Sequence, residues 1–237
     1  MSENPIPHRA LFSPTPDIEN RDAVMAERKK YSQILTDSAA KLHDLDKKAY
    51  TDPLTGLPNR RAFNEHIESI FNDPEAREKS IALMIIDIDG LKRTNETLGH
   101  LKGDKLIQSV ASAFRSSAMN LDSEVLRPSD IFGRFEGDEY FAILLDYKPL
   151  EGQTIQELND NKESNIQTNF IRIAQEIGIP DELHVGLSIG ISVIQPGDTV
   201  ESFIERADVE LKNKKAVKYE SLRKNDIEFH DDRTDRF

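Results

Sequence analysis

Residues 131–145 of the chain read IFGRFEGDEYFAILL. Two short apolar segments, residues 131–135 and 140–145, are separated by the polar residues 136–139. Gly137 within the polar segment can take a positive φ angle, which tight hairpin turns require. The stretch therefore predicts a β-hairpin with an acidic turn.

Other segments supply the rest of an α+β architecture. Residues 80–87 are apolar on both faces and predict a central strand that is covered on both sides. A further strand is expected over residues 184–194, and helical periodicity is found in residues 60–73, 95–117, 166–177 and 200–218. Asn59 is the expected N-cap of the first of these helices, and residues 147–165 are expected to form an irregular insertion loop. This order predicts an α/β sandwich in which helices flank a central mixed or antiparallel sheet.

The N-terminal part of the chain differs in composition. Residues 1–17 contain four prolines and predict a disordered leader, whereas residues 18–50 predict an extended helix. Two interpretations of this helix stay open: a coiled-coil seam shared with a second chain, or an amphipathic helix packed on its own domain. The main domain is expected over residues 51–220, followed by a C-terminal tail over residues 221–237. The coiled-coil interpretation of residues 18–50 depends on eight positions that recur at heptad spacing, which are Val24, Arg28, Tyr31, Leu35, Ser38, Leu42, Leu45 and Ala49.

Composition excludes several classes of protein. The 237 residues include 31 Lys and Arg, 43 Asp and Glu and no cysteine, so the formal net charge is −12. Without cysteine there is no disulfide framework, thiolate metal site or cysteine nucleophile. Excess negative charge disfavours nucleic acid and anionic membranes as partners. No run approaches the roughly 18 apolar residues of a membrane helix, and the N-terminus lacks an apolar signal segment, so we expect a cytoplasmic protein.

Acidic residues gather at two predicted strand ends. Asp87 and Asp89 close the apolar strand on one face, and Asp138 and Glu139 lie in the hairpin turn. If these strands are neighbours, up to four carboxylates converge, with Glu136 a fifth candidate. Such a cluster requires a cation, and carboxylate oxygens select Mg²⁺ or Mn²⁺, which indicates metal-assisted phosphoryl or nucleotidyl transfer. The alternative is an exposed acidic hairpin next to a strand-end cap.

Several motifs in order give the chain a family resemblance. They are DPLTGLPNRRAF (52–63), DIDGLKRTNETLGHLKGD (87–104), RPSDIFGRFEGDEYFAIL (127–144), VGLSIGISV (185–193) and ERADVELKNKK (205–215). Together they resemble the GGDEF family of diguanylate cyclases over residues 45–220. The resemblance implies a polymerase-palm-like nucleotidyl cyclase fold. It also implies that two domains, each with one GTP, meet face to face and form cyclic di-GMP and two pyrophosphates.

The resemblance further implies roles for particular residues. Asp87, Asp138 and the carbonyl of Ile88 correspond to the metal ligands, and Asp138 and Glu139 to the catalytic acids, with Glu139 beside the reacting hydroxyl. Arg127 and Asp130 correspond to an inhibitory product site. The remaining substrate-binding positions are Lys92 and Lys215 for phosphate, Asn95 and Asp104 for guanine, and Gly137 for close approach of the backbone.

Each of these roles has a plainer alternative. Asn95 could cap a helix, Lys92 and Lys215 could be solvated charges, and Arg127 with Asp130 could form a surface ion pair. Arg134, on the hairpin, is as compatible with a structural role as with a functional one.

The sequence also departs from the family pattern. The family signature reads Glu136-Gly-Asp-Glu-Tyr140 in this chain, where Glu136 and Tyr140 replace the usual Gly and Phe. Tyr219 stands where an arginine is expected, so Lys218 is a candidate replacement for that phosphate contact. Three functions remain open: an active Mg²⁺-dependent cyclase that dimerises through its N-terminal helix, a catalytically inactive module that binds GTP or cyclic di-GMP, or a scaffold in which the helix alone matters.

Overall fold

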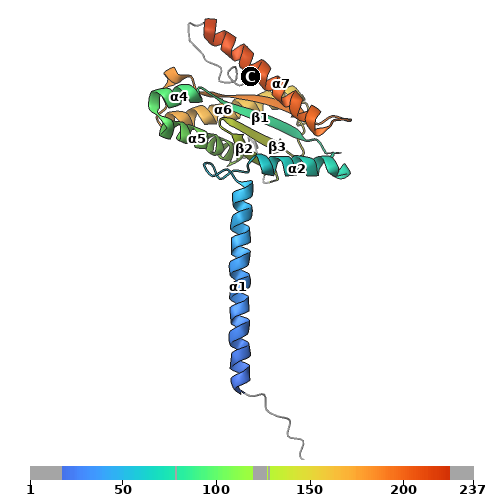
Figure 1. The fold of residues 1–237 in the computed structure, drawn as a ribbon. Helices are drawn as coiled ribbons and strands as arrows, with labels where there is room; N and C mark the ends of the chain where they lie inside the picture. Colours follow the sequence, from blue (N-terminus) through green and yellow to red (C-terminus); the bar gives the residue numbers. More distant parts are fainter. Residues whose placement is uncertain (1–17, 78, 120–126, 128, 225–237) are drawn as a thin grey trace, which may run out of the picture. The chain divides into compact units, whose positions relative to one another are not determined.

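A computed structural model describes residues 18–77, 79–119, 127 and 129–224 of the chain (Figure 1). The chain divides into two compact units, Met1–Lys47 and Lys48–Phe237. The expected leader, residues 1–17, lies outside the described residues, as do residues 225–237. The N-terminal helix α1 spans Ile18–Tyr50, in agreement with the range predicted from the sequence.

The strands of the described chain form one antiparallel sheet in the order β2-β3-β1-β4. Their bounds are β1 (Ala82–Asp89), β2 (Ile131–Glu136), β3 (Glu139–Leu144) and β4 (Gly186–Val193). The predicted hairpin, β2–β3, is confirmed, and β1 pairs with its strand β3, which fulfils the condition on which convergence of the acidic residues depended. In the β1–β3 register Asp87 lies opposite Glu139.

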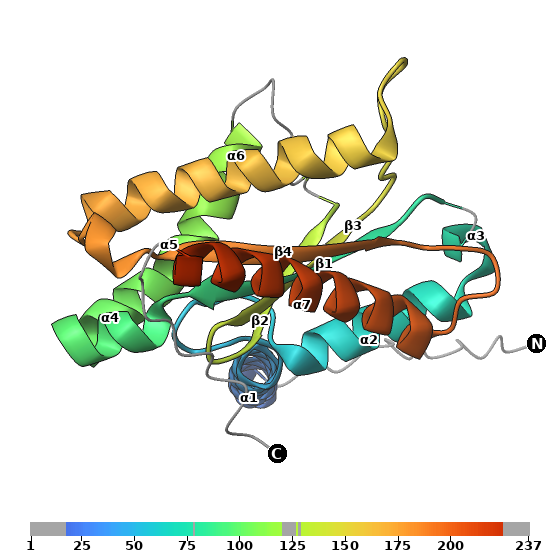
Figure 2. The ribbon, with the colours of Figure 1, turned by 90° about the horizontal axis from the view of Figure 1, so that it is seen from above.

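Helices cover both faces of this sheet (Figure 2). On one face lie α5 (His100–Met119) and α6 (Ile155–Glu176), and on the other lie α2 (Arg60–Asn72) and α7 (Val200–Lys224). Shorter helices are α3 (Pro74–Arg77), α4 (Leu91–Leu98) and the 3₁₀ turn Asp181–Leu183. The predicted α+β sandwich is confirmed.

The two faces of β1 belong to two hydrophobic clusters. Even-numbered residues such as Met84 and Ile86 pack with α5 and α6, and odd-numbered residues such as Leu83 and Ile85 pack with α2 and α7. All residues of the strand are buried, as predicted for a central strand. Because side chains alternate along a strand, Asp87 continues the odd-numbered face and is directed toward α7.

Helix α7 approaches β4 very closely at Gly190. A Cβ atom at this glycine would lie 2.0 Å from the Ala207 carbonyl oxygen and 2.5 Å from the Leu211 nitrogen. The buried face of α7 contains Phe203, Ala207 and Leu211 at intervals of four residues. The next position in this series is Lys215, so the same helix face turns from apolar to cationic beside the acidic end of β1.

Three expected boundaries are wrong. The loop expected over residues 147–165 is helical from Ile155, because Thr154 and Glu157 form a capping box that starts α6. The helix expected over residues 95–117 is divided into α4 and α5 at Gly99, which has a φ of 82°. The last helix continues to Lys224, so the first residues of the expected tail, 221–237, are helical.

In the ranges that the structure describes, no helix is both long enough and apolar enough to cross a bilayer.

Candidate active site

The hairpin turn adjoins the acidic end of β1. The Ile88 amide donates a hydrogen bond to the Asp138 carbonyl oxygen at 3.2 Å, and Glu139 faces Asp87 across the ladder. Asp138 and Glu139 are both half-buried. The sheet register therefore brings together the residues expected to bind metal and to catalyse, although they are about fifty positions apart in the sequence.

Asp87 forms a buried ion pair with α7. The Lys215 Nζ lies 2.5 Å from Asp87 Oδ1. Only 1% of Asp87 and 7% of Lys215 is exposed to solvent. The alternative in which Lys215 is a solvated surface charge is therefore wrong. Because an isolated buried carboxylate is costly, the ammonium group supplies the positive charge that this position requires.

Asp89 has a separate environment on the β4 side of the site. Its carboxylate accepts hydrogen bonds from the Ser188 hydroxyl at 2.9 and 3.0 Å, and Lys218 Nζ lies 2.6 Å from its Oδ2. In the described part of the chain no group of three or more Asp, Glu, His or Cys residues could hold a metal ion. The expected convergence of four or five carboxylates is thus wrong. Lys218, suggested as a phosphate contact, is engaged by Asp89.

A smaller donor set remains beside the turn. It consists of the carboxylates of Asp87 and Asp138 and the backbone carbonyl of Ile88, which lie on directly adjoining segments. All three are hard oxygen donors, which suit Mg²⁺ or Mn²⁺. The ion pair with Lys215 shows that Asp87 is stabilised by a cation in this position. By donor chemistry the set fits a divalent ion.

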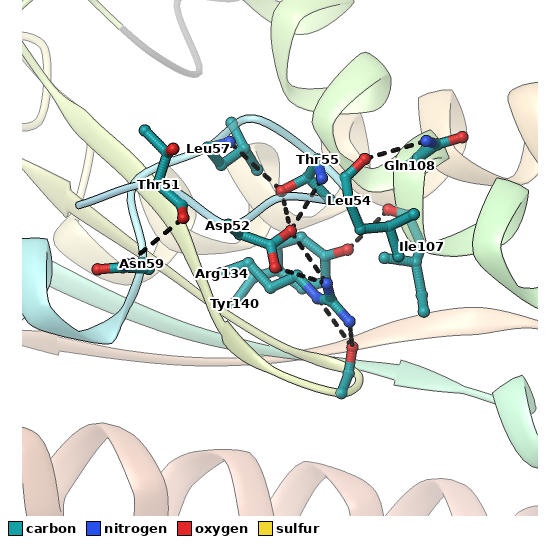
Figure 3. Close-up of polar contacts among 11 residues, drawn as sticks. Thr51, Asp52, Leu54, Thr55, Leu57, Asn59, Ile107, Gln108, Arg134 and Tyr140 are labelled. Atoms are coloured by element: carbon teal, nitrogen blue, oxygen red, sulfur yellow. Dashed lines mark hydrogen bonds and ion pairs between the residues drawn. The ribbon is translucent and has the colours of Figure 1, made fainter. Parts of the chain in front are cut away.

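The turn is held in place by Arg134 (Figure 3). Its Nε and Nη2 donate to the Gly137 carbonyl at 3.0 and 2.8 Å, while Nη1 donates to both carboxylate oxygens of Asp52 at 3.0 and 2.9 Å. Gly137 has a φ of 57°, which a glycine adopts without strain. Arg134, which was open to two interpretations, thus has a structural role: it joins the signature turn to the motif at residues 52–63.

Asp52 receives several hydrogen bonds besides that ion pair. Its Oδ1 accepts from the Thr55 amide at 2.9 Å and the Thr55 hydroxyl at 2.6 Å. Burial acts to raise the pKa of Asp52, but the hydrogen bonds from Thr55 and Arg134 outweigh it and hold the pKa below its ordinary value. The carboxylate is therefore charged at neutral pH.

Both substitutions in the signature are accommodated. Among the described non-glycine residues only Asp146 and His184 have a positive φ, so Glu136 is not strained, and its side chain is exposed. The Tyr140 hydroxyl donates to the Ile107 carbonyl at 2.7 Å (Figure 3), and burial raises the pKa of this tyrosine. The additional hydroxyl therefore ties β3 to α5.

One residue near Glu139 was missed by the sequence analysis. Arg60, the first residue of α2, places Nη2 3.8 Å from Glu139 Oε2, and its guanidinium lies over the Phe135 ring at 4.8 Å. The available signal was the pair of arginines, Arg60 and Arg61, that directly follows the expected N-cap Asn59. The N-cap itself is confirmed, since the Asn59 side chain accepts from the amides of Arg61 and Ala62.

The expected guanine-binding residues lie at the corner between α4 and α5. Asn95 is half-buried inside α4 and Asp104 is half-buried in the first turns of α5. Asn95 is the fifth residue of its helix, so the alternative in which it caps a following helix is wrong. Lys92, on the first turn of α4, is exposed.

The expected product-site pair lies at the other end of the hairpin, before the start of β2. The Asp130 carboxylate accepts from the Arg127 amide at 2.7 Å and the Leu145 amide at 2.8 Å. Burial raises the pKa of Asp130 despite these hydrogen bonds. The Arg127 side chain is exposed and its Nη1 donates to the Asp146 carbonyl at 3.3 Å. Asp130 thus closes the open end of the hairpin through hydrogen bonds to two backbone amides, which is more than a surface ion pair with Arg127 would provide.

Known proteins are similar to this chain in sequence. Residues 49–220 match the family model described as diguanylate cyclase, GGDEF domain. Diguanylate cyclase DgcP of Pseudomonas aeruginosa is 34% identical over 167 residues, which cover 70% of this chain and 22% of that protein. Cyclic di-GMP phosphodiesterase NbdA of the same species is 31% identical over 204 residues, which cover 84% of this chain and 23% of that protein. The chain thus spans about a quarter of the length of these two relatives.

A solved structure has the same architecture. The crystal structure of the coiled coil and GGDEF domain of DgcB from Caulobacter crescentus, in complex with c-di-GMP, matches with a TM-score of 0.65. The match is 24% identical and covers 82% of this chain and 95% of that one. Fold, motifs and family model agree, and the chain belongs to the GGDEF domain family of diguanylate cyclases.

Proposed function

We propose that this chain is an active diguanylate cyclase. It condenses two molecules of GTP into cyclic di-GMP and two pyrophosphates at the interface of a homodimer, in the cytoplasm. The observation that carries the proposal is the register of β1 and β3, which places Asp87 opposite Glu139 and next to Asp138. Both carboxylates of the expected metal pair therefore stand beside a glycine turn suited to a triphosphate.

A divalent ion, Mg²⁺ or Mn²⁺, would be held by Asp87, Asp138 and the Ile88 carbonyl. When bound, such an ion neutralises phosphate charge and favours attack at the α-phosphate. We assign to Glu139 the role of accepting the proton of the attacking 3′-hydroxyl, and to Arg60, whose Nη2 lies 3.8 Å from Glu139 Oε2, the role of orienting this carboxylate. Lys92 and Lys215 are proposed to contact the phosphates, for which Lys215 must leave Asp87.

Binding of the base is assigned to Asn95 and Asp104. An amide and a carboxylate together offer the donors and acceptors that complement a guanine edge. Arg127 and Asp130 are proposed to bind the product at a distance from the reaction centre, at the opposite end of the hairpin. This arrangement would allow cyclic di-GMP to inhibit the enzyme without competing for the guanine position.

A turnover assay tests the proposal. Incubation of the protein with GTP and Mg²⁺ is expected to yield cyclic di-GMP, and Asp138→Asn, which keeps the shape of the side chain, is expected to yield none. Glu151→Gln, on an exposed turn remote from the site, is the matched control and should retain full activity. Absence of product at high protein concentration would contradict the proposal.

A second candidate function is an inactive module that binds GTP or cyclic di-GMP. It is favoured by the Lys215 and Lys218 ion pairs and by Tyr219, which together leave fewer cations for the triphosphate than the family pattern has. One relative bears the name of a cyclic di-GMP phosphodiesterase, so similarity of this domain does not assign synthesis by itself. Calorimetry that detects ligand binding without turnover would favour this function.

A further inference from the structure

Gly103 lies against the side chain of Asn95. A Cβ atom at position 103 would be 1.8 Å from Asn95 Oδ1, 2.8 Å from Cγ and 3.3 Å from Nδ2. These three atoms are the nearest neighbours of that position, and all belong to one carboxamide. The space that any other residue would fill at position 103 is therefore taken by the Asn95 amide.

The backbone at this position does not require glycine. Gly103 lies in the first turns of α5 and is absent from the residues with a positive φ. Glycine in a helix is less stable than alanine by about 0.5–1 kcal/mol. The backbone hydrogen bonds of the corner, from the Gly99 amide to the Asn95 carbonyl at 2.9 Å and from the Gly103 amide to the Gly99 carbonyl at 3.3 Å, do not need a glycine at position 103.

We infer that Gly103 is a positioning residue that sets the orientation of the Asn95 carboxamide and thereby the preference for guanine over adenine. The inference rests on the proposed function, in which Asn95 and Asp104 bind the base. Asp104 follows Gly103 directly, so the turn that leaves room for the amide also carries the carboxylate. Guanine has an acceptor at O6 and donors at N1 and N2, whereas adenine has a donor at N6 and an acceptor at N1, so a displaced amide no longer distinguishes the two bases.

Gly103→Ala tests this inference because it should separate stability from selectivity. The displaced atoms are the end of a flexible side chain, so the amide can rotate away and the protein still folds. The melting temperature is expected to stay the same or rise, since alanine favours the helix. Affinity for a non-hydrolysable GTP analogue, measured by calorimetry with Mg²⁺, is expected to fall about tenfold, as for a lost hydrogen bond. Affinity for the matching ATP analogue should not change.

Two further variants make the test specific. Ser112→Ala, on the exposed side of α5, also favours the helix and should leave both affinities unchanged. Asn95→Ala should weaken binding of the GTP analogue, and adding Gly103→Ala to it should have no further effect, because the two residues act through one amide. A merely structural glycine would instead lower stability in both backgrounds.

The outcomes separate this inference from the proposed function. If Asn95→Ala weakens binding of the GTP analogue but Gly103→Ala does not, or if Gly103→Ala does not fold, the positioning role is wrong. If the unaltered protein binds both analogues equally, the assignment of guanine binding to Asn95 and Asp104 is wrong and the inference is lost with it. If Gly103→Ala lowers the affinity for the GTP analogue alone, and has no such effect when Asn95→Ala is also present, both the positioning role and the assignment of guanine binding are supported.

Discussion

At the scale of single residues, the ion pair between Lys215 and Asp87 is the feature with the clearest energetic consequence. Both groups are buried, and removing one partner of such a pair leaves an uncompensated charge. The sequence offered Asp87 as a metal ligand and Lys215 as a phosphate contact, but it did not indicate that they contact each other. A contact between residues 128 positions apart depends on how α7 crosses the sheet.

Lys215→Met should therefore make the protein less stable and more responsive to Mg²⁺. We expect a loss of about 3 kcal/mol, or roughly 6 to 12 °C in melting temperature, because Asp87 stays buried without its counter-charge. In the absence of nucleotide, Mg²⁺ should raise the melting temperature of this variant by more than it raises that of the unaltered protein. The measurement is thermal unfolding in Mg²⁺ and in EDTA.

Lys212→Met is the matched control for that experiment. Lys212 lies about one turn earlier on α7 and pairs with Asp208 on the surface, where ion pairs contribute little. Its melting temperature should change little and its response to Mg²⁺ not at all. An equal Mg²⁺ response in Lys215→Met and the unaltered protein would show that a metal ion does not take the place of the ammonium.

At the scale of elements, α1 presents the apolar positions predicted from heptad spacing to solvent. Tyr31, Leu35, Leu42 and Leu45 are each at least half exposed in the single chain. A helix with such a stripe is stabilised when a second helix covers it, which favours the coiled-coil interpretation as a proposal.

Replacing Leu35 and Leu42 together by Glu should shift the protein from dimer to monomer. Charges at two seam positions would repel across the helix pair and remove its apolar contact. Light scattering of the whole chain would record the mass, which should halve. Ala26→Glu with Ala40→Glu adds the same charge on α1 away from the seam and should keep the dimer. Monomeric unaltered protein at all concentrations would disprove the role of α1.

Some helices and strands were predictable from the sequence and others were not. The strands were predictable because their apolar runs and the Gly137 turn are local signals. The start of α6 was missed although Thr154 and Glu157 formed a recognisable capping box, because the segment that follows is polar. The break at Gly99 was missed because helical periodicity continues across it.

At the scale of the whole molecule, the Asp52–Arg134 pair joins segments that are 82 positions apart. Asp52 belongs to the motif that follows α1, and Arg134 holds the carbonyl of Gly137 in the signature turn. Through Arg134, the motif at residues 52–63 is thus linked to the turn expected to receive the triphosphate.

The stability that Asp52 contributes should depend on pH. Its pKa is below the ordinary value of 3.8 in the folded protein, so its contribution is complete above that value and is lost as the pH falls through the folded-state pKa. Urea unfolding should show Asp52→Asn to be less stable than the unaltered protein at pH 7. The difference should shrink as the pH falls below about 4.

A double-mutant cycle would attribute this effect to the ion pair. Arg134→Met should cost less stability in the Asp52→Asn background than in the unaltered protein, since the two side chains share one contact. A stability difference between Asp52→Asn and the unaltered protein that is the same at pH 7 and pH 3 would contradict the assignment.

Whether the sheet is mixed or antiparallel was left open by the sequence, which did predict the α+β class, the hairpin with its acidic turn at Gly137, and the family. These follow from alternation, helical period and short motifs, which are properties of neighbouring residues. Which side chains meet depends on the tertiary structure: Asp87 with Lys215, Asp89 with Lys218 and Ser188, Asp52 with Arg134, and Asn95 against Gly103. The reason is physical, because the close approach of α7 to the sheet at Gly190 brings Lys215 and Lys218 to the acidic end of β1, and the other contacts likewise join segments that only the folded chain brings together.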